Sequence, residues 1–232
     1  CLDREISSDR LRPFFASLPG PEAERIQNII KYLTHWMVFR DPPEHPRLRR
    51  LTSKVFHLQS MNGMRPVAEI MINDFLEVCM DQVANHAAKL RYMSGGTCSV
   101  PLVMRAPIGA TGRGSQHAQS MERYFTGVPG MKVVAVSTAY DAKGLMLTAL
   151  RGDDPVMFFE PKRIYRTVKS EVVDNGEALP LDTCFTLRKG RDITLVTWGA
   201  CVVESLQAAQ TLSSQGIEVE VIDLASIKPI DT

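Results

Sequence analysis

The spacing of the hydrophobic residues changes at about residue 100. Before that point, apolar side chains recur three or four residues apart, which predicts helices. After it, short runs of apolar and β-branched residues alternate with helical stretches, which predicts strands joined by helices. This alternation is typical of an α/β fold with a mostly parallel sheet. The chain therefore combines an all-α segment with a longer α/β segment.

The N-terminal segment contains clear signals for helix ends. Residues 1 to about 34 are helical in pattern, with a break at Leu18–Pro21. Asp41–Glu44 combines an N-cap acid, prolines in the first turn and a glutamate at the third helical position. After a turn at Asn62–Gly63, a further helix is predicted from about Pro66 to Val78. Its buried side is predicted to consist of Val67, Met71, Phe75 and Val78.

The α/β segment begins with a helix predicted over residues 80–96, which ends at a pair of glycines. Its inward residues are predicted to be Val83, Ala84, Ala87 and Leu90. Strands are predicted at 102–104, 133–136, 156–159, 194–197 and 219–222, and helices at 120–125, 140–150 and 202–215. The polar stretch from about 166 to 190 is interpreted as an interdomain linker. The last two strands and their helix predict a right-handed βαβ unit.

One loop stands out as a candidate site. The apolar run at 102–104 leads into a loop with glycines at 109, 112 and 114, and then to His117 before a helix start at Ser120. Glycines permit a close backbone approach to a ligand, and an imidazole can exchange a proton near neutral pH. The alternative is a surface histidine beside a loop. His86, inside the helix predicted over 80–96, is interpreted as a packing or surface residue.

Composition restricts the function classes. The chain has 232 residues and a net charge of +1, so it offers no electrostatic argument for binding nucleic acid or an anionic membrane. No apolar run approaches the length of a membrane span, and the start is not a targeting sequence. The five cysteines are scattered without a Cys-x-x-Cys pair, which predicts reduced thiols in the cytoplasm or an organellar matrix.

Residues 36–56 resemble the C-helix region of soluble bacterial-type cytochrome P-450 monooxygenases, and the resemblance extends over about 1–78. It implies that His45 and Arg49, four residues apart on one helical face, bind haem propionates. The family's Phe-x-x-Gly loop with the thiolate cysteine is absent from the chain. We therefore expect no functional haem. A solvated basic face is the alternative interpretation.

Residues 80–232 resemble the β subunit of thiamine-diphosphate-dependent 2-oxo acid dehydrogenases, closest to the branched-chain and acetoin types. The resemblance rests on several runs, among them Asn85-His-Ala-Ala-Lys, Gln116-His-Ala-Gln-Ser, Pro129-Gly-Met-Lys-Val-Val, Tyr140-Asp-Ala-Lys-Gly-Leu and Phe158-Phe-Glu-Pro-Lys. It implies a transketolase-like α/β fold. The predicted organisation is a helical P-450-like fragment at 1–78, a partial pyrimidine-binding domain at 80–165, a linker at 166–190 and the start of a transketolase C-terminal domain at 191–232.

The resemblance also implies an activity and a set of ligands. The activity is oxidative decarboxylation of a 2-oxo acid with acyl transfer to a lipoyl group, with His117 as the catalytic histidine. Thiamine diphosphate and magnesium are shared with an α subunit in a hetero-oligomer, and a lipoyl-bearing acyltransferase is the next partner. Potassium is implied at backbone carbonyls near Leu102, Val103, Ala149, Gly152 and Asp154.

The sequence also departs from the family. The catalytic glutamate lies upstream of the point where the resemblance begins, so we expect an incomplete site. Ala118 stands where serine is usual, and Met121 where proline or leucine is usual. Two other function classes remain open: a non-catalytic module that binds an α subunit, and a haem monooxygenase fragment.

Overall fold

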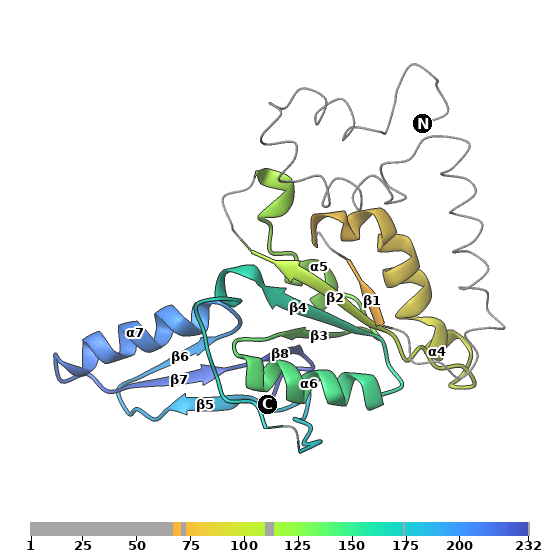
Figure 1. The fold of residues 1–232 in the computed structure, drawn as a ribbon. Coiled ribbons are helices and arrows are strands. Elements are labelled where there is room, and N and C mark those ends of the chain that lie inside the picture. The colour runs from red at the N-terminus through yellow and green to blue at the C-terminus, as the bar shows by residue number, and fades with distance from the viewer. Residues whose placement is uncertain (1–66, 71–72, 110–113, 174, 232) are drawn as a thin grey trace, which may run out of the picture. The chain divides into compact units, whose positions relative to one another are not determined.

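The computed structural model describes residues 67–70, 73–109, 114–173 and 175–231 (Figure 1). The chain divides into two units, Cys1–Gly63 and Met64–Thr232, and all described residues belong to the second. The predicted junction near Val78–Met80 therefore falls inside one structural unit.

The first sheet has five strands in the order β1-β2-β4-β3-β8. Its strands are β1 (Val67–Glu69), β2 (Val103–Ile108), β3 (Lys132–Ala135), β4 (Val156–Pro161) and β8 (Ser226–Lys228). The first four run parallel, and β8 pairs antiparallel with β3. The prediction of a mostly parallel sheet is confirmed. β8, which comes from the end of the chain, was not predicted.

The second sheet has three strands in the order β5-β7-β6 (Figure 1). They are β5 (Phe185–Arg188), β6 (Ile193–Thr197) and β7 (Val219–Asp223). β6 and β7 are parallel and joined by α7 (Cys201–Ser213), so the predicted βαβ unit is present. β5 pairs antiparallel with β7 and lies inside the predicted linker. Strand β5 is short and partly polar, so its sequence alone does not predict a strand. It becomes recognisable only through its pairing with β7.

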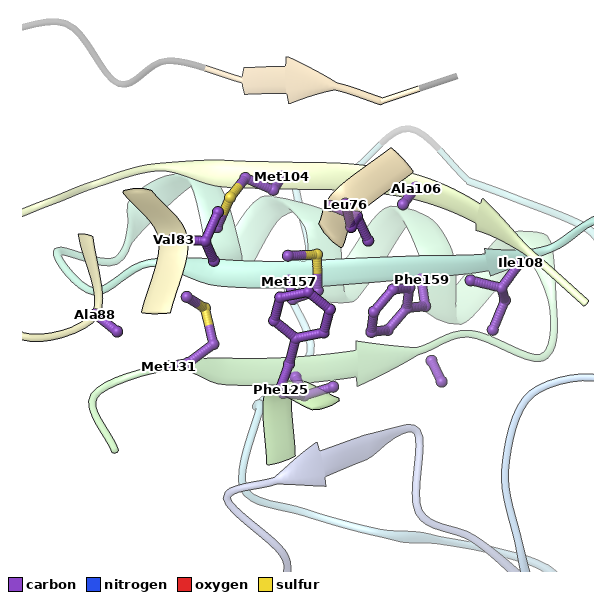
Figure 2. Packing of buried hydrophobic residues seen from close by; sticks show 12 residues of the cluster. Leu76, Val83, Ala88, Met104, Ala106, Ile108, Phe125, Met131, Met157 and Phe159 are labelled. Carbon is purple, nitrogen blue, oxygen red and sulfur yellow. The ribbon is translucent and has the colours of Figure 1, made fainter. Parts of the chain in front are cut away.

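The first sheet is covered on both faces. One face packs against η2 (Asn73–Cys79), η3 (Gln82–Ala87) and α5 (Glu122–Thr126). Figure 2 shows Leu76 and Val83 beside β2 and β4, and Phe125 beside β3 and β4. The rings of Phe125 and Phe159 lie 5.8 Å apart between their centroids. The other face packs against α6 (Ala139–Arg151). Burial on both faces explains why β2, β3 and β4 are nearly continuous apolar runs.

The prediction of a helix from Pro66 to Val78 is wrong. Residues 67–69 form an edge strand of the first sheet, and a 3₁₀ helix follows at 73–79. A 3₁₀ helix has three residues per turn, so a stripe of α-helical spacing does not stay on one side. Phe75 is 52% exposed and Val78 84%, whereas Leu76 is fully buried. Met71, also predicted to be inward, lies outside the described residues.

The helix predicted over 80–96 is present as two short pieces, η3 and α4 (Leu90–Met93). η3 is a π-helix, in which the Ala88 amide donates to the Val83 carbonyl five residues earlier. The buried pair is consequently Val83 and Ala88, and Leu90 is exposed. The glycine ending is confirmed, because the Gly96 amide closes a 2.8 Å hydrogen bond to the Arg91 carbonyl.

The segment between the two sheets packs along α6. The Leu179 amide donates to the Gly144 carbonyl at 3.0 Å, and the Thr148 hydroxyl donates to the Leu179 carbonyl. Lys143 bonds to the Val173 carbonyl from the same helix. Gly144 is required here, since a Cβ at this position would lie 2.4 Å from Leu179 Cγ.

Candidate active site

The His117 loop starts where β2 ends. Gly109 follows Ile108 with a φ of 87°, and Gly114 has a φ of 94°, both in the left-handed region that favours glycine. A short 3₁₀ turn, η4 (Ser115–His117), then presents an exposed His117. The prediction that a strand leads through glycines to an exposed imidazole agrees with the structure. Gly112 lies outside the described residues.

One hydrogen bond across the loop and two contacts from other elements hold the loop in place. The Gly109 amide donates to the Gln119 carbonyl at 3.0 Å and closes the base of the loop. The Gln119 side chain donates to Asp74 Oδ1 at 2.7 Å, which ties the loop to η2. Lys162 Nζ donates to the His117 carbonyl oxygen at 2.5 Å. Asp74 and Lys162 have no local signal in the sequence, because each lies 45 residues from its partner along the chain.

Asp74 is an unusual carboxylate. Its side chain is 7% exposed, and its second oxygen, Oδ2, has no hydrogen-bond partner among the residues that the structure describes. A buried carboxylate oxygen without a donor is costly, so such groups usually have a specific role. Here the carboxylate orients the amide of Gln119, two residues after His117.

A charged cluster lies along β2 and β4. Arg105 donates two hydrogen bonds to Glu160, from Nε at 2.7 Å and from Nη2 at 3.1 Å, and the Tyr165 hydroxyl donates to Glu160 at 3.0 Å. Burial first, and then the Glu160 charge, raises the pKa of Tyr165. The hydrogen bond to Glu160 raises the pKa of Arg105. These groups therefore keep Tyr165 neutral and Arg105 charged.

Glu160 and Tyr165 also line a cavity of about 210 Å³ at the start of α6. Its other walls are mainly apolar, from residues such as Val136, Pro161 and Ile164. The cavity lies directly beside the strand end that carries Lys162.

A second buried polar cluster joins β3 to β7. The Ser137 hydroxyl lies 2.5 Å from Asp223 Oδ2 and 3.2 Å from Asp141 Oδ2. Asp141 also accepts from the amides of Ser137 and Thr138 and caps α6. Asp223 is 2% exposed, and burial raises its pKa to about 6.

Three of the five residues predicted to hold potassium line one cavity. Ala149, Gly152 and Asp154 border a space of about 340 Å³. The Leu102 carbonyl accepts a sheet hydrogen bond from the Val156 amide at 2.9 Å, and Val103 lies in β2. Burial acts to raise the pKa of Asp154, but hydrogen bonds from Arg91 and Lys132 lower it overall. The carboxylate is therefore an ion-pair partner, and ligation by the carbonyls remains a prediction.

Some of the remaining sequence predictions concern residues that the structure describes, and others concern residues outside the described ranges. His45 and Arg49 lie outside the described residues. Four cysteines (79, 98, 184 and 201) are free thiols, as predicted. His86 is exposed, and its Nε2 atom lies 3.4 Å from Asp81 Oδ2, so it is a surface residue. Within the described ranges, no three His, Cys, Asp or Glu side chains group as metal ligands, and no helix is long and apolar enough to cross a membrane.

The chain matches two known domain families. Residues 59–168 match "Transketolase, pyrimidine binding domain", and residues 183–232 match "Transketolase, C-terminal domain". The first match includes residues 59–78, which overturns their assignment to a cytochrome P-450 fragment. This result agrees with β1 and η2, which belong to the α/β unit.

Curated relatives extend the comparison. The chain is 46% identical over 170 residues to "Acetoin:2,6-dichlorophenolindophenol oxidoreductase subunit beta" of Cupriavidus necator, covering 73% of this chain and 50% of the relative. It is 46% identical over 173 residues to "2-oxoisovalerate dehydrogenase subunit beta" of Bacillus subtilis, covering 74% and 53%. The chain therefore spans about half the length of the curated relatives it matches.

A solved structure supports the fold. A split-gene transketolase, described as an inactive β4 tetramer, superposes with a TM-score of 0.54 at 24% identity, over 74% of this chain and 53% of that one. The described residues within 59–168 thus have the transketolase pyrimidine-binding fold and those within 183–232 the beginning of the transketolase C-terminal fold, in a chain similar to the β subunits of 2-oxo acid and acetoin dehydrogenases.

Proposed function

We propose that the chain is the β-subunit part of the decarboxylating component of a 2-oxo acid dehydrogenase, an oxidoreductase. In this role it takes part in the oxidative decarboxylation of a 2-oxo acid and the transfer of the acyl group to a lipoyl group. The observation that carries the proposal is the exposed His117, whose loop follows a parallel strand and is held by one hydrogen bond across the loop and by contacts from two other elements. The similarity to dehydrogenase β subunits supports it.

His117 is proposed as the catalytic residue. Ligands of open parallel sheets bind outside the carboxyl ends of the strands, which is where this loop lies. An exposed imidazole there can hold or release a proton at its ring nitrogens near neutral pH. Its task would be to orient the substrate or the lipoyl group and to exchange a proton with it.

The described residues fit a supporting role toward thiamine diphosphate. When bound, this cofactor supplies the electron sink for decarboxylation. The chain's own contribution is the imidazole of His117 beyond the carboxyl ends of the parallel strands. The resemblance to dehydrogenase β subunits implies that the diphosphate and magnesium are held by an α subunit, and we propose the same arrangement here. Potassium at the backbone carbonyls of 102, 103, 149, 152 and 154 remains part of the proposal.

The proposed partners are an α subunit of the same component and a lipoyl-bearing acyltransferase, in the cytoplasm or an organellar matrix. A second candidate is a non-catalytic module that binds the α subunit without supporting turnover. The departures from the family at Ala118 and Met121 of the histidine loop favour this alternative. The P-450 resemblance of residues 1–58, with His45 and Arg49, lies outside the described residues and stays a prediction.

The test is reconstitution of the full chain with a purified α subunit, thiamine diphosphate and magnesium, followed by assays of decarboxylation of branched-chain 2-oxo acids and pyruvate and of acetoin oxidation. We expect His117→Ala to lower kcat by about 100-fold or more, the size of a lost proton-transfer group. The control His86→Ala should stay within about threefold of the unmodified chain.

Each outcome separates the candidates. Activity that survives His117→Ala within about threefold would remove the histidine from the mechanism. A stable complex with the α subunit that shows no turnover would favour the assembly module. Loss of activity in both histidine variants would indicate a folding effect, which circular dichroism would detect.

A further inference from the structure

Lys162 emerges next to the His117 loop because of the strand order. β2 and β4 are neighbours, and their register places Ile108 opposite Pro161. The residues that follow these two therefore leave the sheet side by side. One chain continues into Gly109 and the histidine loop, and the other into Lys162 at the start of η5 (Lys162–Ile164).

The ammonium group of Lys162 contacts the backbone of the histidine itself. Nζ lies 2.5 Å from the His117 carbonyl oxygen, and the side chain is half-buried. By contrast, the hydrogen bond within η4, from the His117 amide to the Gly114 carbonyl, is 3.4 Å long. Hydrogen bonds from a charged donor are shorter and stronger than neutral ones. Lys162 therefore supplies a charged hydrogen-bond donor to the backbone of His117.

We propose that Lys162 is a positioning residue for His117. It fixes the backbone of η4 and so the direction in which the imidazole leaves the loop. The Gly109–Gln119 hydrogen bond closes the loop and Asp74 holds its far side, so Lys162 supplies the restraint at the histidine. The catalytic meaning of this restraint rests on the function proposed above, whereas the restraint itself does not.

Hydrogen exchange of the full chain tests the restraint without any assay of activity. Lys162→Met removes the donor and keeps the length of the side chain, Lys162→Arg keeps a charged donor, and Lys169→Met removes an exposed lysine as a control. We expect Lys162→Met to speed exchange in peptides covering residues 114–119 by about tenfold, which corresponds to about 1.4 kcal/mol. Lys162→Arg should recover most of this loss, and Lys169→Met should change nothing.

Two results would overturn the proposal. One is unchanged exchange at 114–119 in Lys162→Met, and the other is faster exchange spread evenly over β2, β3 and β4, which would show a general structural role. In the reconstituted enzyme, we expect Lys162→Met to lower kcat with little change in KM and Lys162→Arg to restore it.

The two proposals fail separately. If His117→Ala keeps full activity while Lys162→Met loosens the loop, then His117 is not catalytic and the positioning contact stands. If His117→Ala abolishes activity while the loop is unaffected by Lys162→Met, then the catalytic proposal stands and the positioning role is refuted.

Discussion

The buried carboxyl group of Asp223 should make the stability of the fold depend on pH in an unusual direction. Most carboxylates favour the folded state when ionised, because they gain partners there. Asp223 has the opposite balance, since burial raises its pKa from 3.8 to about 6 and the nearby Asp141 charge adds to the rise. The hydrogen bonds from Ser137 and the Ala225 amide offset only part of this effect.

The direction in which the stability changes with pH follows from proton binding. The folded state holds a proton on Asp223 more tightly than the unfolded chain, so the contribution of this group is complete below about pH 4 and is lost as the pH rises through about 6. A difference of about 2 pKa units corresponds to roughly 3 kcal/mol. Of the described titratable groups, Asp141 is the one whose charge acts on Asp223.

Asp223→Asn removes the titration and keeps the shape. The amide can still accept the hydrogen bond from the Ala225 amide and donate to the Ser137 hydroxyl. Urea unfolding measures the free energy of unfolding of both proteins. We expect the unmodified chain to gain roughly 3 kcal/mol relative to Asp223→Asn when the pH is lowered from about 7 to about 4. Asp182→Asn, at an exposed position, is the control.

A difference between the two proteins that stays constant with pH would refute this reasoning. It would mean that Asp223 is as well solvated in the folded chain as in the unfolded one. A difference that changes in the opposite direction would mean that the hydrogen bonds from Ser137 and Ala225 outweigh burial.

Two further predictions concern the packing of the first sheet. Leu76→Ala should destabilise the chain by about 2–5 kcal/mol in urea unfolding because Leu76 is fully buried, while exposed Phe75→Ala should cost less than about 1 kcal/mol. Equal effects would place residues 73–79 outside the core. Gly130→Ala should reduce the yield of folded protein or lower Tm by several degrees, since a Cβ there would lie 1.9 Å from the Ala88 oxygen and φ is +85°. Gly127→Ala, with open space around it, should have little effect, and similar Tm values for both variants would contradict the close approach.

The elements that the sequence predicted are those whose signals are local. β2, β3 and β4 are apolar runs buried on both faces, and α6 begins with a capping box at Thr138 and Asp141. Each of these can be recognised without knowing its neighbours. The predicted bounds differ from the observed ones by one residue at either end of α6.

The elements that were missed depend on distant partners. β1 and β8 have three residues each, and β1 exists because it pairs with β2 about 35 residues later. The 3₁₀ and π geometry of 73–87 moved the buried residues away from the α-helical stripe. Neither effect leaves a periodic signal in a short segment.

The candidate site divides in the same way. His117 was singled out because glycines, an imidazole and a helix start follow one another along the chain, and because this run resembles the histidine loop of dehydrogenase β subunits. Asp74 and Lys162 could not be found by that reasoning, since their relation to the loop depends on the order of the strands. A lysine after a strand is ordinarily a solvated charge, and only the register of β2 with β4 gives it a partner.

The strand order also links the two matched domains to the site. β8 comes from the C-terminal segment and pairs with β3, and the Ala135 amide donates to the Ala225 carbonyl at 2.8 Å. Ser137, two residues further, reaches Asp223 of the second sheet. β3 in turn pairs with β4, whose end carries Lys162. β8 thus pairs with β3, and β3 pairs with β4. Through this pairing, the beginning of the C-terminal domain helps to hold the sheet on which the histidine loop depends.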